Sequence, residues 1–167
     1  MKLHFLALPV LLAGCTTLQT QVEINAPARE VRAILYDFAD YPKWNPYITK
    51  VDGTVAEGSQ VYLTVKPDGK PEFTGGATII SATEDRLSWI GSGLSGIESG
   101  SISMSIPGIL SARHDFVIQE LGPDRTLFLN NDKMSGAAVP VYDLKPIKAG
   151  LDAMNEALKK RAEEKPK

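Results

Sequence analysis

The 167-residue chain has ordinary globular composition, 43% hydrophobic and 23% charged, and is long enough to bury a core without disulfide staples. It carries 18 Lys and Arg against 20 Asp and Glu, a net charge of −2, and contains no basic stripe. This charge pattern argues against nucleic acid as a partner.

The first fourteen residues have the pattern of a secretory signal. Lys2 precedes an apolar run, 5–13, that is too short to span a bilayer. The run ends in "LAGC", which resembles the bacterial lipobox, and Cys15 is the single cysteine of the chain. We therefore predict a lipoprotein signal peptide at 1–14 and a lipidated Cys15 as the mature N-terminus. The alternative is a signal peptide with an incidental cysteine.

Residues 15–20 are expected to form a short tether, because strand-like alternation starts near Gln21. Acyl chains such as palmitate on Cys15 would hold the domain close to a membrane. We expect a lipid-anchored protein of the cell envelope. Thr16, rather than Asp, follows the cysteine, which favours the outer membrane facing the periplasm if the source is Gram-negative.

A first strand and a helix come next. Val22 and Ile24 share one strand face, and Pro27 suits the first turn of a helix. The helix would bury the apolar residues Val31, Ile34, Leu35 and Phe38. Because Pro42 and Pro46 interrupt "ADYPKWNP", that stretch can form at most a turn or a very short helix.

Strand-length runs follow, and one long helix closes the chain. The expected strands are 47–56, 60–66, 72–84, 86–91, 101–106, 112–121 and 125–134. The helix should begin or kink at Pro146, and its apolar residues are Leu144, Ile147, Leu151, Met154 and Leu158. Its charged end, 159–167, is expected to fray. This order predicts an α+β fold, a curved antiparallel sheet wrapped around a long C-terminal helix.

The stretch "INAPAREVRAILYDFADYPKWNPYI" resembles the opening of the START-like, or SRPBCC, superfamily of polyketide cyclases/dehydrases and lipid transport proteins. "RLSWIG", "RHDFVIQEL", "RTLFLNNDKMSG" and "AGLDAMNEALKKRAEE" agree with it in order, so the likeness covers about 21–164, leaving 165–167 as a tail. It implies a helix-grip, Bet v 1-like domain with a cavity between sheet and helix. Members bind lipids, sterols, polyketides or plant hormones there, and only some are enzymes.

Strand parity suggests which residues line that cavity. His114 shares a face with Phe116, while Asn130 and Asp132 share one with Phe128. If the Phe-bearing faces point inward, three polar groups enter an apolar space, where they would orient a ligand. The alternative is a structural polar cluster. The resemblance implies Glu where Asp132 stands, so the shorter side chain weakens any catalytic role.

The full set of candidate ligand-binding residues adds aromatic and apolar neighbours. Trp44 and Tyr47 would lie over an opening of the cavity, unless the rings of segment 36–47 simply fill the core. The candidates are Trp44, Tyr47, Leu63, Trp89, Met104, His114, Phe116, Phe128, Asn130, Asp132, Met134, Leu151 and Met154.

Segment 91–111 is unusually rich in Gly and Ser, which make up 12 of its 21 residues. As a hypothesis, Leu94, Ile97, Ile109 and Leu110 form a lid or a membrane-facing rim. The alternative is a flexible hairpin without a role.

Other chemistries lack their motifs. The chain has no GK[ST] loop and no GxSxG, and its two histidines are too few for a His-rich metal site, so we expect no metal or other cofactor.

Three functions remain open. The first is a membrane-anchored, non-catalytic binding protein for a hydrophobic small molecule or lipid. The second is a cyclase- or hydrolase-like enzyme that uses a His114/Asp132 acid–base pair. The third is an envelope interaction protein with a vestigial cavity and an unknown protein partner. The binding function requires a hollow, and fails if Trp89, Phe116, Phe128 and Met154 fill the interior.

Overall fold

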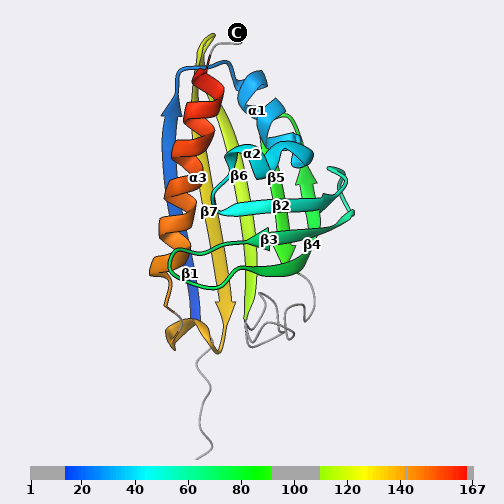
Figure 1. Ribbon diagram of the computed structural model, residues 1–167, viewed down its shortest axis with the longest axis vertical. Coiled ribbons are helices and arrows are strands. Elements are labelled where there is room, and N and C mark those ends of the chain that lie inside the picture. The colour runs from blue at the N-terminus through cyan, green and yellow to red at the C-terminus, as the bar shows by residue number, and fades with distance from the viewer. Residues whose placement is uncertain (1–13, 92–109, 142, 165–167) are drawn as a thin grey trace, which may run out of the picture.

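The computed structural model describes residues 14–91, 110–141 and 143–164, and its centre is one antiparallel sheet (Figure 1). Within the described residues, seven strands lie in the order β1-β7-β6-β5-β4-β3-β2. The strands are β1 Gly14–Ile24, β2 Ile48–Gly53, β3 Gln60–Val65, β4 Phe73–Ala82, β5 Arg86–Gly91, β6 Ser111–Gly122 and β7 Arg125–Gly136.

Helices cover one face of this sheet. They are α1 Ala28–Tyr36, α2 Tyr41–Trp44 and α3 Lys145–Glu163, with single 3-10 turns η1 Phe38–Asp40 and η3 Val139–Val141. In Figure 1, α3 runs along β1 and β7, while β2 and β3 cross the view nearly at right angles to them. The sheet therefore curls around its last helix, and the expected α+β helix-grip fold is confirmed.

The inward faces of β6 and β7 are those that strand parity predicts. Burial alternates along both strands, and Phe116 and Phe128 are fully buried. His114, Asn130 and Asp132 are buried on the same faces as these rings. The Phe-bearing faces thus point toward the helices, and they carry three polar side chains inward.

Strand β1 begins at Gly14, not near Gln21, so the expected tether at 15–20 is wrong. Its pairing with β7 is continuous from Gly14 opposite Gly136 to Ile24 opposite Thr126. Thr16 and Thr20 alternate with exposed residues, and as β-branched residues they suit a strand although they are polar. The hydrophobic pattern missed this half because its inward positions are not all apolar.

The aromatic segment after α1 forms a packed ladder of rings. The ring centroids of Phe38 and Tyr41 lie 5.5 Å apart, and those of Tyr41 and Trp44 lie 5.1 Å apart, both edge to face. Tyr41 is fully buried, and its hydroxyl donates to the carbonyl of Leu35 at 2.8 Å. As expected, "ADYPKWNP" forms only short helical turns. The aromatic rings of these turns pack against the hydrophobic core.

Helix α3 has Pro146 in its first turn, as expected, and it does not fray before Glu163. The Glu163 carboxylate accepts hydrogen bonds from the backbone N and Nδ2 of Asn25 at 2.7 and 2.9 Å. Arg161 donates to Asp40 at 3.0 Å. These contacts hold the end of α3, so the expected fraying applies at most to 165–167, which lie outside the described residues.

No helix among the described residues has the length and hydropathy needed to cross a bilayer. The predicted signal peptide lies almost wholly in 1–13, and the hypothesised rim residues Leu94, Ile97 and Ile109 also fall outside the described residues. Leu110, by contrast, is buried at the start of the β6 region, 3% exposed.

Candidate functional site

A cluster of rings fills part of the interior beneath the helices. Trp89 and His114 stack with centroids 5.3 Å apart, and Trp89 meets Phe116 edge to face at 5.0 Å. Phe128 lies 5.5 Å from Phe116. These rings, with Met154 of α3, are at most 7% exposed. The centre of the sheet is therefore packed by side chains, and a ligand would have to lie beside this ring cluster rather than within it.

A chain of hydrogen bonds crosses the inner face next to the rings. His114 Nε2 lies 2.7 Å from Asn130 Oδ1, and Asn130 Nδ2 donates to Asn155 Oδ1 at 2.9 Å. Asn155 Nδ2 donates to Thr20 Oγ1 at 3.0 Å, and Thr20 donates to the carbonyl of Asn130 at 3.0 Å. This polar chain links β6, β7, α3 and β1. It ends at the backbone carbonyl of Asn130, the residue whose side chain also takes part in it.

The polar chain determines the tautomer of His114. Because Asn130 Nδ2 donates to Asn155, its Oδ1 must be the acceptor toward His114, and Nε2 must carry a hydrogen. Burial lowers the pKa of His114, although Asp132 and the bond to Asn130 oppose the shift. The ring is therefore neutral near pH 7, with Nδ1 as its acceptor nitrogen.

Asp132 lies directly opposite His114 in the β6–β7 ladder and opposite Leu18 of β1. It is 3% exposed, and its buried Oδ1 has no hydrogen-bond partner. Burial raises the pKa of the Asp132 carboxyl, and the nearby His114 opposes that shift. None of the hydrogen bonds or ion pairs among the described residues joins Asp132 to His114, so the two do not form a hydrogen-bonded dyad.

Beside the ring cluster, the inner face carries small side chains. Ala77 of β4 pairs with Gly91 of β5, and Ala112 of β6 pairs with Met134 of β7. Ala77, Ala112 and Met134 are buried, at 0, 3 and 1% exposure. We call Ala77, Gly91 and Ala112 the small-residue row. It lies next to Asp132, His114 and Trp89, on the side nearer the end of the sheet where β1 begins.

The described candidate residues lie in the interior, with the exception of the half-buried Trp44. Tyr47 is buried against α3, where a Cβ on Gly150 would overlap its ring, so it packs on the helix. Trp44 keeps a buried Nε1 without a hydrogen-bond partner. Met104 lies outside the described residues. Buried at 7% exposure or less are Tyr47, Leu63, Trp89, His114, Phe116, Phe128, Asn130, Asp132, Met134, Leu151 and Met154.

Two residues of the polar chain were not predicted from the sequence, Thr20 and Asn155. Asn155 is 2% exposed and lies on the apolar face of α3, next to Met154 and one turn after Leu151. A polar residue at a core position of a helix must find a partner, and that rule would have singled it out. Thr20 was assigned to the tether.

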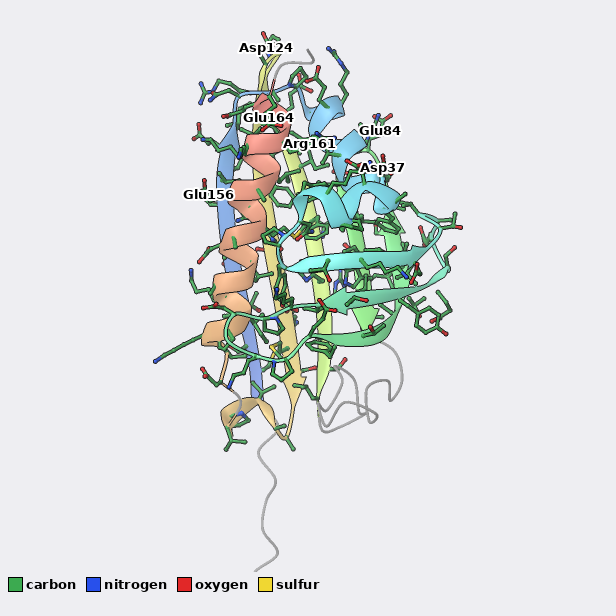
Figure 2. All side chains as sticks on the ribbon, in the orientation of Figure 1. Asp37, Glu84, Asp124, Glu156, Arg161 and Glu164 are labelled. Carbon is green, nitrogen blue, oxygen red and sulfur yellow. The ribbon has the colours of Figure 1, made fainter. Side chains whose placement is uncertain are left out.

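An open pocket of about 320 Å³ lies elsewhere, between α1 and the turn from β4 to β5. Its lining includes Arg29, Arg32, Glu84 and Glu120. Arg32 pairs with Glu84 at 3.3 Å, and Figure 2 shows Glu84 beside α1 at this edge. This pocket is open and lined mostly by charged side chains, and it reaches the inner face of β6 only at Ile118 and Glu120. Among the described residues, no cluster of His, Cys, Asp and Glu could hold a metal ion.

Solved structures share the fold. A START superfamily protein from Mycobacterium smegmatis is 24% identical, with a TM-score of 0.65 over 88% of this chain and 97% of that one. The Zhui aromatase/cyclase of Streptomyces sp. R1128 is 16% identical, with a TM-score of 0.64 over 90% and 94%. Truncated norcoclaurine synthase of Thalictrum flavum is 13% identical, with a TM-score of 0.64 over 92% and 97%.

No curated protein sequence matches the chain. The family model described as "Polyketide cyclase / dehydrase and lipid transport" matches residues 16–102, just over half of the 167 residues. That stretch contains the first five strands and both short helices of the sheet's covered face. With the sheet curled around α3, this match means that the chain belongs to the polyketide cyclase/dehydrase and lipid transport family.

Proposed function

We propose that this protein binds a hydrophobic small molecule or lipid on the inner face of its sheet, without transforming it, while acyl chains on Cys15 anchor it to a membrane. The observation that carries the proposal is the make-up of that face. Its lining is apolar and its polar groups are few, which is how small-molecule sites orient a ligand. Apart from Asp132, those groups bond to one another through the polar chain.

The ring cluster limits where the ligand lies. Trp89, Phe116, Phe128 and Met154 pack the centre of the interior, where the binding function was predicted to need a hollow. We therefore limit the proposal to a ligand that lies beside these side chains and does not span the interior. The apolar body instead lies along the small-residue row, where Ala77, Gly91 and Ala112 have no side chain beyond Cβ. Asp132 and His114 stand at the border between the two regions.

The position of Cys15 supports the anchoring. Cys15 is exposed and pairs with Ser135, which in turn pairs with Ser111, at the end of the sheet toward which the small-residue row runs. A lipidated Cys15 would therefore place the membrane at the same end as the ligand. On this proposal the protein is an envelope lipoprotein, at the outer membrane facing the periplasm if the source is Gram-negative.

Native mass spectrometry tests the binding function. The chain from Gly14 onward, carrying Cys15→Ser, would be purified without detergent and weighed before and after organic extraction. An extractable apolar molecule at near one per chain is the expected result. Enlarging the small-residue row with Ala112→Leu should expel it, whereas Ala56→Leu on the β2–β3 connection should not. A chain that stays empty with added lipid extracts would overturn binding and favour the envelope interaction role.

One observation favours an enzyme as the second candidate. Two adjacent buried groups have pKa values shifted in opposite directions, His114 downward and Asp132 upward, as often occurs at active sites. Neutral His114 would act as a base through Nδ1, in a cyclase- or hydrolase-like reaction. Turnover of the extracted ligand that is lost in His114→Ala but kept in Arg125→Ala, at the far turn, would establish catalysis.

A further inference from the structure

The buried carboxyl of Asp132 lacks a hydrogen-bond donor. Its Oδ1 is buried without a hydrogen-bond partner, in a side chain that is 3% exposed and on the inner face. An unpaired buried acceptor destabilises the folded protein, and more so when it is charged. Such a group in a folded protein calls for a specific explanation, and a bound ligand is one.

The neighbours of Asp132 cannot supply what it lacks. In the ladder it lies between Leu18, which has no donor, and His114, whose Nε2 hydrogen is directed to Asn130. Neutral His114 then offers only its acceptor nitrogen. The titratable groups that act on Asp132 are His114 and Asp115.

Asp115 does not change this balance. Its carboxylate lies on the outer face, where it accepts from Arg113 at 2.9 Å, from Arg86 at 3.2 Å and from Ser88 at 2.5 Å. Both arginines are thus engaged on the far side of the sheet. Among the described residues, no Lys or Arg contributes to the field at Asp132.

We infer that the ligand carries a protonated amine on an apolar body, and that the amine donates a hydrogen bond to Asp132 Oδ1. This inference rests on the proposed binding function and names its ligand class. A cationic donor supplies both the hydrogen bond and the positive charge that Asp132 lacks. A charge-assisted hydrogen bond is also about twice as strong as a neutral one. The apolar body would lie along the small-residue row, beside Met134 and Ala112. Burial raises the pKa of Asp132, and a bound cation would lower it again.

Three probes of equal chain length test the inference: decylamine, 1-decanol and decanoate. Their binding to the Cys15→Ser chain would be measured by isothermal titration calorimetry near neutral pH. We expect decylamine to bind at least about tenfold more tightly than decanol, and decanoate to bind most weakly, because only the amine brings a cationic donor. Equal binding of all three probes would overturn the inference and leave the binding function standing. If none of them binds, both fail.

Asp132→Asn keeps the shape of the side chain and removes its charge. In this variant the ratio of decylamine to decanol affinity should fall to near one. The matched control is Asp124→Asn, which makes the same charge change on an exposed turn at the opposite end of the sheet (Figure 2) and should keep the ratio of the parent chain. A ratio that survives in Asp132→Asn contradicts the inference. If this variant does not fold by circular dichroism, the probe order on the parent chain still decides.

Discussion

The ring of Tyr47 lies directly on Gly150 of α3, with no room for a Cβ between them. Tyr47 follows α2, so this contact joins the aromatic segment to the final helix. Its consequence is that α3 needs glycine at that point for steric reasons, although glycine is a poor helix former.

Gly150→Ala should therefore destabilise the fold, by about 1–3 kcal/mol, because the added methyl overpacks the Tyr47 contact. Helix propensity alone predicts the opposite sign, since Ala is favoured over Gly by about 1 kcal/mol. Urea unfolding followed by circular dichroism measures the difference. Gly122→Ala, where a Cβ meets nothing within 4 Å, is the control. A stabilised Gly150→Ala protein would show that the ring can move aside.

Thr20→Val should lower the free energy of unfolding by about 1–3 kcal/mol, because it leaves Asn155 Nδ2 without its acceptor and removes the side-chain hydrogen bond to the Asn130 carbonyl. Valine keeps the shape and the strand preference of threonine. Thr17→Val makes the same change at an exposed position of β1 and should have little effect. Equal unfolding midpoints for the two variants would mean that water replaces the hydroxyl.

His114 should stay neutral below the pH at which an exposed histidine titrates. Because its folded pKa lies below the unfolded value of about 6.5, the unfolded state binds the proton more readily, and stability is lost as pH falls below that value. The chain from Gly14 onward has a single histidine, so imidazole ¹⁵N spectra of that chain report on His114 alone. They should show the Nε2–H tautomer. A titration midpoint at or above 6.5 would contradict the expected shift.

Cys15→Ser should move the protein from the membrane fraction to the soluble fraction, because serine cannot receive the thioether-linked lipid. Intact mass should fall by the mass of the whole attached lipid. Thr17→Ser, two residues along the same strand and also exposed, should leave the protein at the membrane. If the Cys15→Ser protein sediments with membranes as before, the lipid anchor is wrong.

The fold could be predicted largely because its strongest patterns are local. Phe116 and Phe128 lie on strands whose apolar residues alternate, and Leu151, Met154 and Leu158 repeat at helical spacing. The start of β1 could not be predicted in that way. Its inward Thr16 and Thr20 are polar, and their partners on β7 lie more than a hundred residues away in the chain.

The sequence predicted which polar side chains share the inner face, but it did not predict which of them form hydrogen bonds with one another. Strand parity predicted that His114, Asn130 and Asp132 share the inner face, and the enzyme alternative paired His114 with Asp132, which lies directly opposite it. The hydrogen bond goes instead to Asn130, a diagonal neighbour, because Asn155 of α3 orients that amide. Such a choice depends on a helix packed from a distant part of the sequence, which strand periodicity does not contain.

Cys15 lies within strand β1, so a lipid on Cys15, if it is attached as we propose, would be joined directly to the sheet without a flexible linker. A domain anchored in this way could not reorient freely relative to the bilayer, and its opposite end could not turn toward the membrane. The eleven residues of β1 would stand about 35 Å tall at 3.2–3.4 Å each, so the end with α1 would reach outward by that height. Any partner that collects cargo from the aqueous side would have to meet the domain there or along its flanks.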